Sequence, residues 1–161
     1  MVSLGLLVLR LAASVVLIAH GAHTLFGTFA GPGIGPGGLT NVSAHFTSIG
    51  LEPGFALAVL AGVIQFAGGI LLAAGFLTRW AAIAVLGYIA IGIWKEHAQW
   101  GFFLNWVGDP ARANGTEYSI LFAGVLFCLA VAGAGDWSID GRREDKAAAR
   151  AMGRARLRNK I

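Results

Sequence analysis

Titratable and polar side chains interrupt the most apolar parts of this 161-residue chain. Two histidines, His20 and His23, stand near the end of the first apolar block, and Gln65 stands within the second. The triplet "KEH" ends the third block, and Glu117 opens the fourth. Imidazole, amide and carboxylate groups in such positions could take part in a redox site, relay protons, or ligate a haem or a metal ion.

The composition of the chain is typical of a membrane protein. Hydrophobic residues make up 57% of it and charged residues only 12%, whereas a soluble domain carries about 25% charged residues. A bilayer core of about 30 Å takes about 20 helical residues to cross. We therefore predict an all-α four-transmembrane-helix bundle over residues 1–140, rather than a soluble helical domain. Its approximate spans are 4–26, 55–77, 80–97 and 117–135.

Positive charge gathers after the last apolar block. Eight Lys and Arg residues against two acidic residues give the tail 141–161 a net charge of +6. Because Lys and Arg are enriched in cytoplasmic segments, we predict a cytoplasmic tail and, with four spans, a cytoplasmic N-terminus. Arg10 interrupts the first block and no basic residue precedes it, so we expect a retained span rather than a cleaved secretory signal.

The tail "REDKAAARAMGRARLRNK" is rich in Ala and Arg, which predicts a basic helix. Such a helix can contact anionic membrane lipid or an acidic soluble protein partner. Nucleic acid is not expected as a partner, and a homo-oligomer stays open. We expect a multi-pass protein of a prokaryotic plasma (cell) membrane.

The first two helices each carry polar residues on one side. At about 100° per residue, Arg10 and His20 fall on the same side of the first helix, and His23 lies about 60° from His20. Small residues let helices approach closely, so we expect Gln65 to be buried on such a face and to need a partner. The small residues on this stripe of the second helix are Ala58, Gly62, Gly69 and Ala73.

The third helix ends in three consecutive polar residues, of which a regular helix can turn at most one or two inward. Tyr88 shares a face with Lys95, seven residues further on. With the predicted topology, the ends of these helices lie at one level in the outer leaflet. We therefore predict an inward-facing polar site in the outer half of the bundle, formed by His20, Gln65, His97 and Glu117, with His23, Arg10, Tyr88, Lys95 and Glu96 as secondary candidates.

Two smaller predictions concern the remaining segments. Apolar residues spaced three to four apart over 39–49 predict a short amphipathic helix in the outer interface, with His45 on its surface. Cys128 is the one cysteine in the chain, so no intramolecular disulfide can form and electron transfer through cysteine pairs is excluded. We expect Cys128 to be a small buried hydrophobe.

Seven segments, in their order and spacing, resemble the DoxX family of small four-helix membrane proteins over roughly residues 6–140. These segments are "HGAHTLFG", "GPGIGPGG", "SIGLEPG", "GGILLAAGFLTRW", "EHAQWGFF", "GTEYSILF" and "GAGDWSID". Two positions depart from the family pattern, because Thr24 stands where Lys is common and Gln65 stands where an acidic residue is common. The resemblance implies redox work at the membrane: some relatives are subunits of thiosulfate:quinone oxidoreductase, and others accompany soluble sulfur-handling or oxidative-stress enzymes.

Three functions follow from these observations. A membrane redox subunit would bind quinone in the outer half of the bundle and receive electrons from a partner oxidoreductase, because the chain has no flavin motif and no cysteine pair. A haem b or metal-binding protein would use His20 with His97, or His20 and His23 with Glu117. A non-catalytic membrane anchor or assembly factor would dock a soluble enzyme through its basic tail.

Overall fold

The computed structural model describes residues 2–29, 31 and 35–158, and its regular elements are helices. Three residues of the "GPGIGPGG" segment (32–34) and the last three of the tail (159–161) lie outside the described residues. The long bundle helices are α1 (Val2–Phe26), α3 (Gly54–Ala74), α4 (Thr78–Gly92) and α5 (Glu117–Ala132). The other elements are α2 (Leu39–Ser48), the π-helical η1 (Ile93–His97), the 3-10 turn η2 (Ala98–Trp100) and α6 (Ile139–Arg158).

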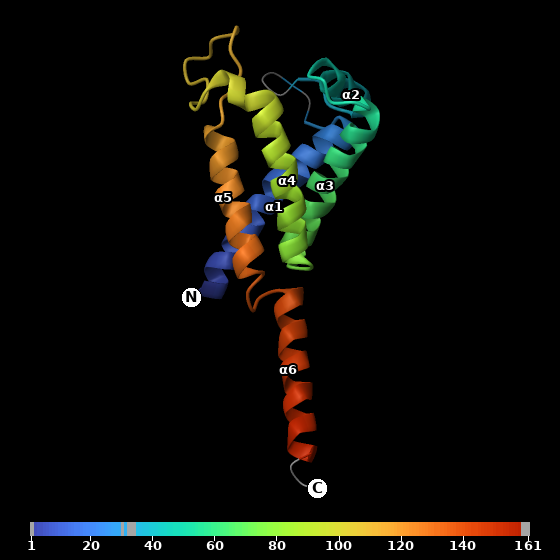
Figure 1. Cartoon of the computed structure of the whole chain (residues 1–161), viewed down its shortest axis with the longest axis vertical. Coiled ribbons are helices and arrows are strands. Elements are labelled where there is room, and N and C mark those ends of the chain that lie inside the picture. The colour runs from blue at the N-terminus through green and yellow to red at the C-terminus, as the bar shows by residue number, and fades with distance from the viewer. Residues whose placement is uncertain (1, 30, 32–34, 159–161) are drawn as a thin grey trace.

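The four long helices pack as a ring. α1 lies along α3, α3 packs against α4, and α4 packs against α5, with a smaller contact between α5 and α1. Consecutive long helices run in opposite directions (Figure 1). The segment 101–116 and the described residues of 27–53 therefore lie at one end of the bundle, which we call the loop end. The α3–α4 turn, the start of α1 and α6 lie at the opposite end, which we call the tail end (Figure 1).

Glycines bring α1 and α3 into close contact. A Cβ atom added at Gly21 would lie 2.4 Å from the backbone nitrogen of Phe66, and one added at Gly62 would lie 2.6 Å from Leu25. Ala58, Gly62 and Gly69 of the predicted small-residue stripe are all buried in α3. The predicted close approach of helices along this stripe is therefore confirmed.

The apolar core lies between the four long helices. Its members come from all four long helices: Ala13, Leu17, Leu72, Ala81, Ala82, Val85, Phe122, Leu126 and Leu129. The outward faces are apolar as well, with Val15 70% exposed and Leu121 70% exposed. A soluble protein rarely exposes so continuous an apolar surface, so this surface fits a membrane protein.

Two described helices, α1 and α3, are long and apolar enough to cross a membrane, and α5 is a shorter apolar helix. The amphipathic helix predicted over 39–49 is confirmed as α2, and the predicted basic helix is confirmed as α6. The prediction for Cys128 is wrong, because its side chain is exposed on the outward face of α5. Its helical position is next to that of Phe127, which is also exposed, so an apolar residue here faces outward rather than inward.

A network of buried polar contacts holds the tail end together. Arg10 is 0% exposed. Its guanidinium donates from Nη1 to the carbonyl oxygen of Leu72 at 3.3 Å and from Nη2 to that of Trp137 at 2.8 Å. Gly75 ends α3 with φ +64, and a Cβ atom there would overlap the Arg10 side chain, so this position requires glycine. These contacts join α1, the end of α3 and the α5–α6 connection.

Asp140 extends this network to the next helix. Its carboxylate accepts hydrogen bonds from the backbone nitrogens of Leu77 at 3.1 Å and Thr78 at 3.0 Å. A carboxylate at this position satisfies free N–H groups at the N-terminus of α4. The start of α6 is therefore fixed to the bundle, while the rest of α6 projects away from it (Figure 1).

Candidate functional site

A cavity of about 290 Å³ lies at the loop end between α1, α3, α4, η1 and α5. In Figure 1, α1 runs obliquely behind α4, so that it starts near α5 at the tail end and ends near α2 and α3 at the loop end. Leu17 and Phe122 belong both to the apolar core and to the lining of the cavity. Ligand pockets measure about 300–1,000 Å³, so this cavity of about 290 Å³ is at the small end of the scale and has room for one small ring system.

Three of the four residues predicted to form the polar site line this one cavity: His20, Gln65 and His97. Gln65 is 3% exposed, and its side-chain Nε2 donates to the carbonyl oxygen of Ala61 at 3.2 Å. His20 is exposed on α1, so its ring lies where the cavity opens. The secondary candidates Tyr88 and Glu96 also line the cavity.

The π-helical turn η1 places the end of the third long helix. Glu96 and His97 are consecutive, and both line the cavity. A π turn inserts one residue into a helix and changes the direction of the side chains that follow, and such turns are frequent at functional sites. Lys95 does not line this cavity, and its Nζ lies 4.4 Å from the ring centroid of Trp94.

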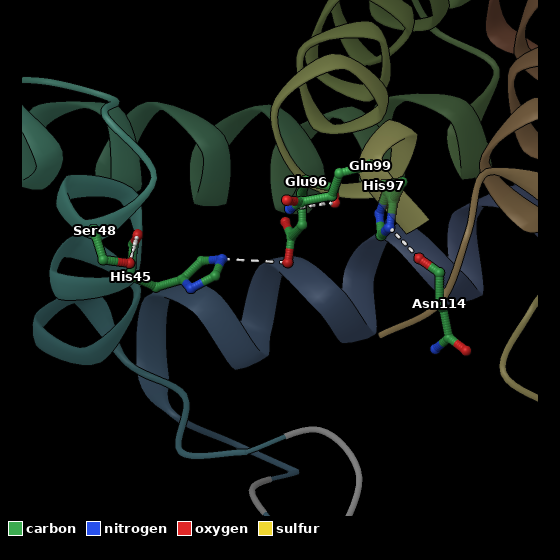
Figure 2. A network of polar contacts seen from close by, with 6 residues as sticks. All are labelled: His45, Ser48, Glu96, His97, Gln99 and Asn114. Carbon is green, nitrogen blue, oxygen red and sulfur yellow. Dashed lines mark hydrogen bonds and ion pairs between the residues drawn. The ribbon is translucent and has the colours of Figure 1, made fainter. Parts of the chain in front are cut away.

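The loop 101–116 fixes the ring of His97. Its Nδ1 lies 3.1 Å from the carbonyl oxygen of Asn114 (Figure 2). Because a carbonyl oxygen only accepts hydrogen bonds, Nδ1 carries the proton and donates it. In the neutral ring, Nε2 is then an acceptor that can take up a proton.

Glu96 links η1 to α2. Its Oε1 lies 3.2 Å from Nε2 of His45, and the two side chains are 41% and 48% exposed. Figure 2 shows Glu96 pointing toward His45, while His97 points toward the opposite side and Asn114. Glu96 also lines a second hollow, of about 400 Å³, together with His45 and His23. The carboxylate therefore borders both the internal cavity and a hollow at the loop end.

Two aromatic rings form one wall of the cavity. Tyr118 and Phe122 stack with their ring centroids 5.8 Å apart and their planes 10° apart. Ser119, which is 7% exposed, lines the cavity beside them. Sequence reasoning missed Ser119 and treated His45 only as a surface residue. Ser119 lies on the buried face of α5 with Phe122 and Leu126, but α5 is apolar on all sides, so the sequence carried no signal for this position.

The structure places Glu117, His23 and Arg10 away from this cavity. Glu117 Oε2 accepts hydrogen bonds from the backbone nitrogen of Leu104 at 3.0 Å and from Nε1 of Trp106 at 3.4 Å, so it holds the loop 101–116. His23 is 8% exposed. Its Nδ1 donates to the carbonyl oxygen of Thr28 at 2.8 Å.

The set His20, His23 and Glu117, considered above for a metal ion, is therefore not assembled around the cavity. Within residues 2–29, 31 and 35–158, no group of three or more His, Cys, Asp or Glu side chains is placed to hold a metal ion. His20 and His97, considered above as a haem pair, do border the same space.

Fold and site together define an all-helical membrane protein with a polar cavity at one end. The DoxX family model matches residues 5–98, which is more than half of the chain, and the protein belongs to the DoxX family. The matched region contains five polar residues that line the cavity: His20, Gln65, Tyr88, Glu96 and His97. Comparison of the chain with curated proteins and with solved structures gave no match.

Proposed function

We propose that this DoxX-family protein is a membrane redox subunit that binds the ring of a quinone in the loop-end cavity. The observation that carries the proposal is the convergence of His20, Gln65 and His97 from three different elements on one cavity of about 290 Å³. A partner oxidoreductase supplies the electrons. Reduction of the quinone then takes up two electrons and two protons, and converts its two carbonyl groups to hydroxyl groups.

The lining of the cavity suits a planar ring with two carbonyl oxygens. The stacked rings of Tyr118 and Phe122 offer a flat aromatic face. The imidazole of His20, the amide of Gln65 and the hydroxyl of Tyr88 are the groups available to donate hydrogen bonds to the carbonyl oxygens.

Protons reach the ring from the loop end. Glu96 borders the cavity and the hollow that it shares with His45, so a proton taken up at His45 has a carboxylate beside it. His97 Nε2 is the second proton-exchanging group at the cavity, because its Nδ1 is committed to Asn114. We assign proton delivery to Glu96 and His97 on this basis.

For the membrane, we propose four spans with both termini in the cytoplasm of a prokaryotic cell. The 15 residues of α4 cover about 22 Å at about 1.5 Å per residue, and η1 continues this helix to His97 without a break. The 16 residues of α5 cover about 24 Å, and locally thinner bilayer accommodates a short span. The +6 charge of the tail supports its cytoplasmic location.

Labelling of single cysteines tests this topology. In a Cys128→Ser background, we expect a membrane-impermeant maleimide to label Asn105→Cys in intact cells. Ala147→Cys on α6 should be labelled only after the membrane is opened. Labelling of both positions in intact cells, or of Ala147→Cys alone, would contradict the proposed orientation.

Quinone binding tests the function directly. We expect lipid extracts of the purified protein to contain quinone, and added quinone to quench tryptophan fluorescence with a saturable curve. Gln65→Leu should weaken binding about tenfold, because it removes a buried hydrogen-bonding group from the cavity. Gln99→Leu is the matched control. Gln99 also donates to a nearby backbone carbonyl, that of Glu96 three residues earlier, but it is exposed and does not line the cavity.

Two results would refute quinone binding. One is an extract without quinone together with no saturable response to added quinone. The other is an equal loss of affinity in Gln65→Leu and Gln99→Leu. The absorption spectrum of the same sample separates the haem alternative, because bound haem b would give a Soret band.

A second candidate function is that of a membrane anchor for a soluble enzyme. It is favoured by α6, which projects away from the bundle (Figure 1) and is exposed over residues 142–152. A basic helix in this position fits an acidic protein partner. Deletion of residues 142–161 should then release a co-purifying enzyme while leaving quinone binding unchanged. Unchanged co-purification would reject α6 as the docking element.

A further inference from the structure

A groove of about 320 Å³ lies between α2, α3 and α4. It runs beside the loop-end cavity that His20, Gln65 and His97 line, the polar cavity. The lining of the groove is apolar over most of its length and includes Phe46, Leu57, Leu60, Ile64, Ala84 and Gly87. Lys95 and Glu96 are the charged residues of the lining, and both lie in η1 at the loop end. Leu60 is 53% exposed and Ile91 is 48% exposed, so the groove opens on the outward face of the bundle.

The groove and the polar cavity share a wall. Tyr88, Gly92 and Glu96 line both spaces. Gly92 contributes no side chain to this wall, and a Cβ atom added there would meet nothing within 4 Å. At Gly92, one helical turn from both Tyr88 and Glu96, no side chain therefore adds to this wall.

On the side away from the groove, the polar cavity is bordered by α1 and α5. There, His20 on α1 and Tyr118 on α5 are exposed, so a hydrocarbon chain leaving in that direction would pass polar groups. The groove between α3 and α4 offers an apolar path of comparable volume. A molecule with a polar ring and a long apolar chain matches the two spaces in this arrangement.

We propose that the groove holds the isoprenoid tail of the quinone whose ring occupies the polar cavity, with the tail crossing at Gly92. The substrate class is then a long-chain isoprenoid quinone that enters from the side, out of the membrane, rather than a small water-soluble quinone. This inference rests on the proposed function and adds to it the nature and the entry side of the substrate.

The test compares quinones with and without a tail in nanodiscs. Menadione and menaquinone-4 form one pair, and 2,3-dimethoxy-5-methylbenzoquinone and ubiquinone-10 form a second pair with a different ring. Binding is measured as tryptophan quenching against the mole fraction of quinone in the bilayer. For the unaltered protein, we expect the tailed member of at least one pair to bind about tenfold more tightly than its tail-less partner.

Gly87→Phe is the variant that blocks the groove. Gly87 lines the groove but not the polar cavity, and a Cβ atom there meets nothing within 4 Å. We expect Gly87→Phe to abolish the preference for the tail while tail-less quinone binds within about twofold of its original affinity. Ala84→Phe, at a second position of the groove lining, should have the same effect and serves if Gly87→Phe fails to fold.

Gly124→Phe on α5 is the matched control. Gly124 is exposed, has open space beside it and lines neither space, so this variant should keep the preference for the tail. A preference for the tail that survives both Gly87→Phe and Ala84→Phe overturns the proposal. The absence of any preference for the tail in the unaltered protein also overturns the proposal. That result would mean that phospholipid acyl chains, rather than a quinone tail, occupy the groove. If neither member of either pair binds the unaltered protein, the proposed function fails, and the inference fails with it.

Discussion

The two ends of the bundle use buried polar residues in opposite ways. At the tail end, Arg10 is fully buried and donates to two backbone carbonyl groups that belong to other segments. At the loop end, Gln65 is 3% exposed, and its Nε2 donates to a carbonyl of its own helix. Its side chain also hydrogen-bonds that of Tyr88, and both side chains border a cavity. A buried polar group whose partners are distant parts of the backbone holds the fold together. One that borders an internal space is available for a ligand.

This comparison predicts that substitutions at the tail end reduce stability, whereas substitutions at the loop end reduce ligand binding. The largest effect is expected for Arg10→Met. It removes both hydrogen bonds of the buried guanidinium: the carbonyl of Trp137 loses its Arg10 donor, and that of Leu72 keeps only the backbone nitrogen of Gly75 at 3.1 Å. The free energy of unfolding should fall by about 3 kcal/mol. Thermal unfolding in detergent measures the change. Arg150→Met, on the exposed part of α6, is the control and should change stability by less than about 0.5 kcal/mol. Equal melting temperatures for both variants would show that the buried contacts of Arg10 do not stabilise the fold.

The next effect is expected at the contact between α1 and α3. Gly21→Ala places a methyl group 2.4 Å from the backbone of Phe66, so the helices must separate, at a cost of about 1–3 kcal/mol. Gly5→Ala lies in the same helix with nothing within 4 Å, and should be neutral or slightly stabilising because Ala favours helix. The same melting experiment compares them. A loss for Gly5→Ala as large as that for Gly21→Ala would contradict the assignment of the Gly21 effect to packing against Phe66.

At the loop end, Tyr88→Phe should act on binding instead. It removes a hydroxyl group that lines the cavity and hydrogen-bonds Gln65, and it keeps the ring. Quinone should bind about fivefold to tenfold more weakly, while the free energy of unfolding falls by about 1 kcal/mol, less than for Arg10→Met. Tyr118→Phe keeps the ring stacked on Phe122 and should change the affinity less than twofold. Quenching titrations give both values. A fall in melting temperature without a change in affinity would mean that Tyr88 is a packing residue.

The smallest effect on stability is expected for the contact between His45 and Glu96. Both side chains are close to half exposed, and exposed pairs contribute about 0.2–1 kcal/mol. A double-mutant cycle with His45→Ala and Glu96→Gln should therefore give a coupling energy below about 1 kcal/mol. Coupling as large as the effect of Arg10→Met would mean that this contact stabilises the fold and would weaken its assignment to proton delivery.

Much of the fold could be predicted from the sequence because membrane-type helices have strong local signals. The long apolar runs around Leu17 and Leu72, the amphipathic spacing of 39–49 and the basic composition of the tail each correspond to a helix. Cys128 was placed on the wrong face, since α5 is apolar on all sides and its pattern does not say which side faces inward.

The site was harder to predict because it depends on tertiary contacts. His20 and Gln65 follow from the polar side of one helix and the small-residue face of the other. The arrangement of Glu96 and His97 depends on the π turn η1, which has no reliable signature in a single sequence. Glu117 accepts hydrogen bonds from Leu104 and Trp106 of the loop 101–116. The spacing of apolar residues in α5 does not predict the conformation of that loop, so it could not predict this role of Glu117.

Photo-labelling with an azidoquinone tests the central claim most directly, because it asks where in the molecule a quinone lies. The protein in nanodiscs is irradiated with an excess of unmodified quinone present or absent, and the modified peptides are identified by mass spectrometry. We predict label that competes with quinone on the peptides containing His20, Tyr88 and His97, which border the loop-end cavity. Label confined to the tail end, around Arg10 and Trp137, or label that excess quinone does not displace, would contradict the account.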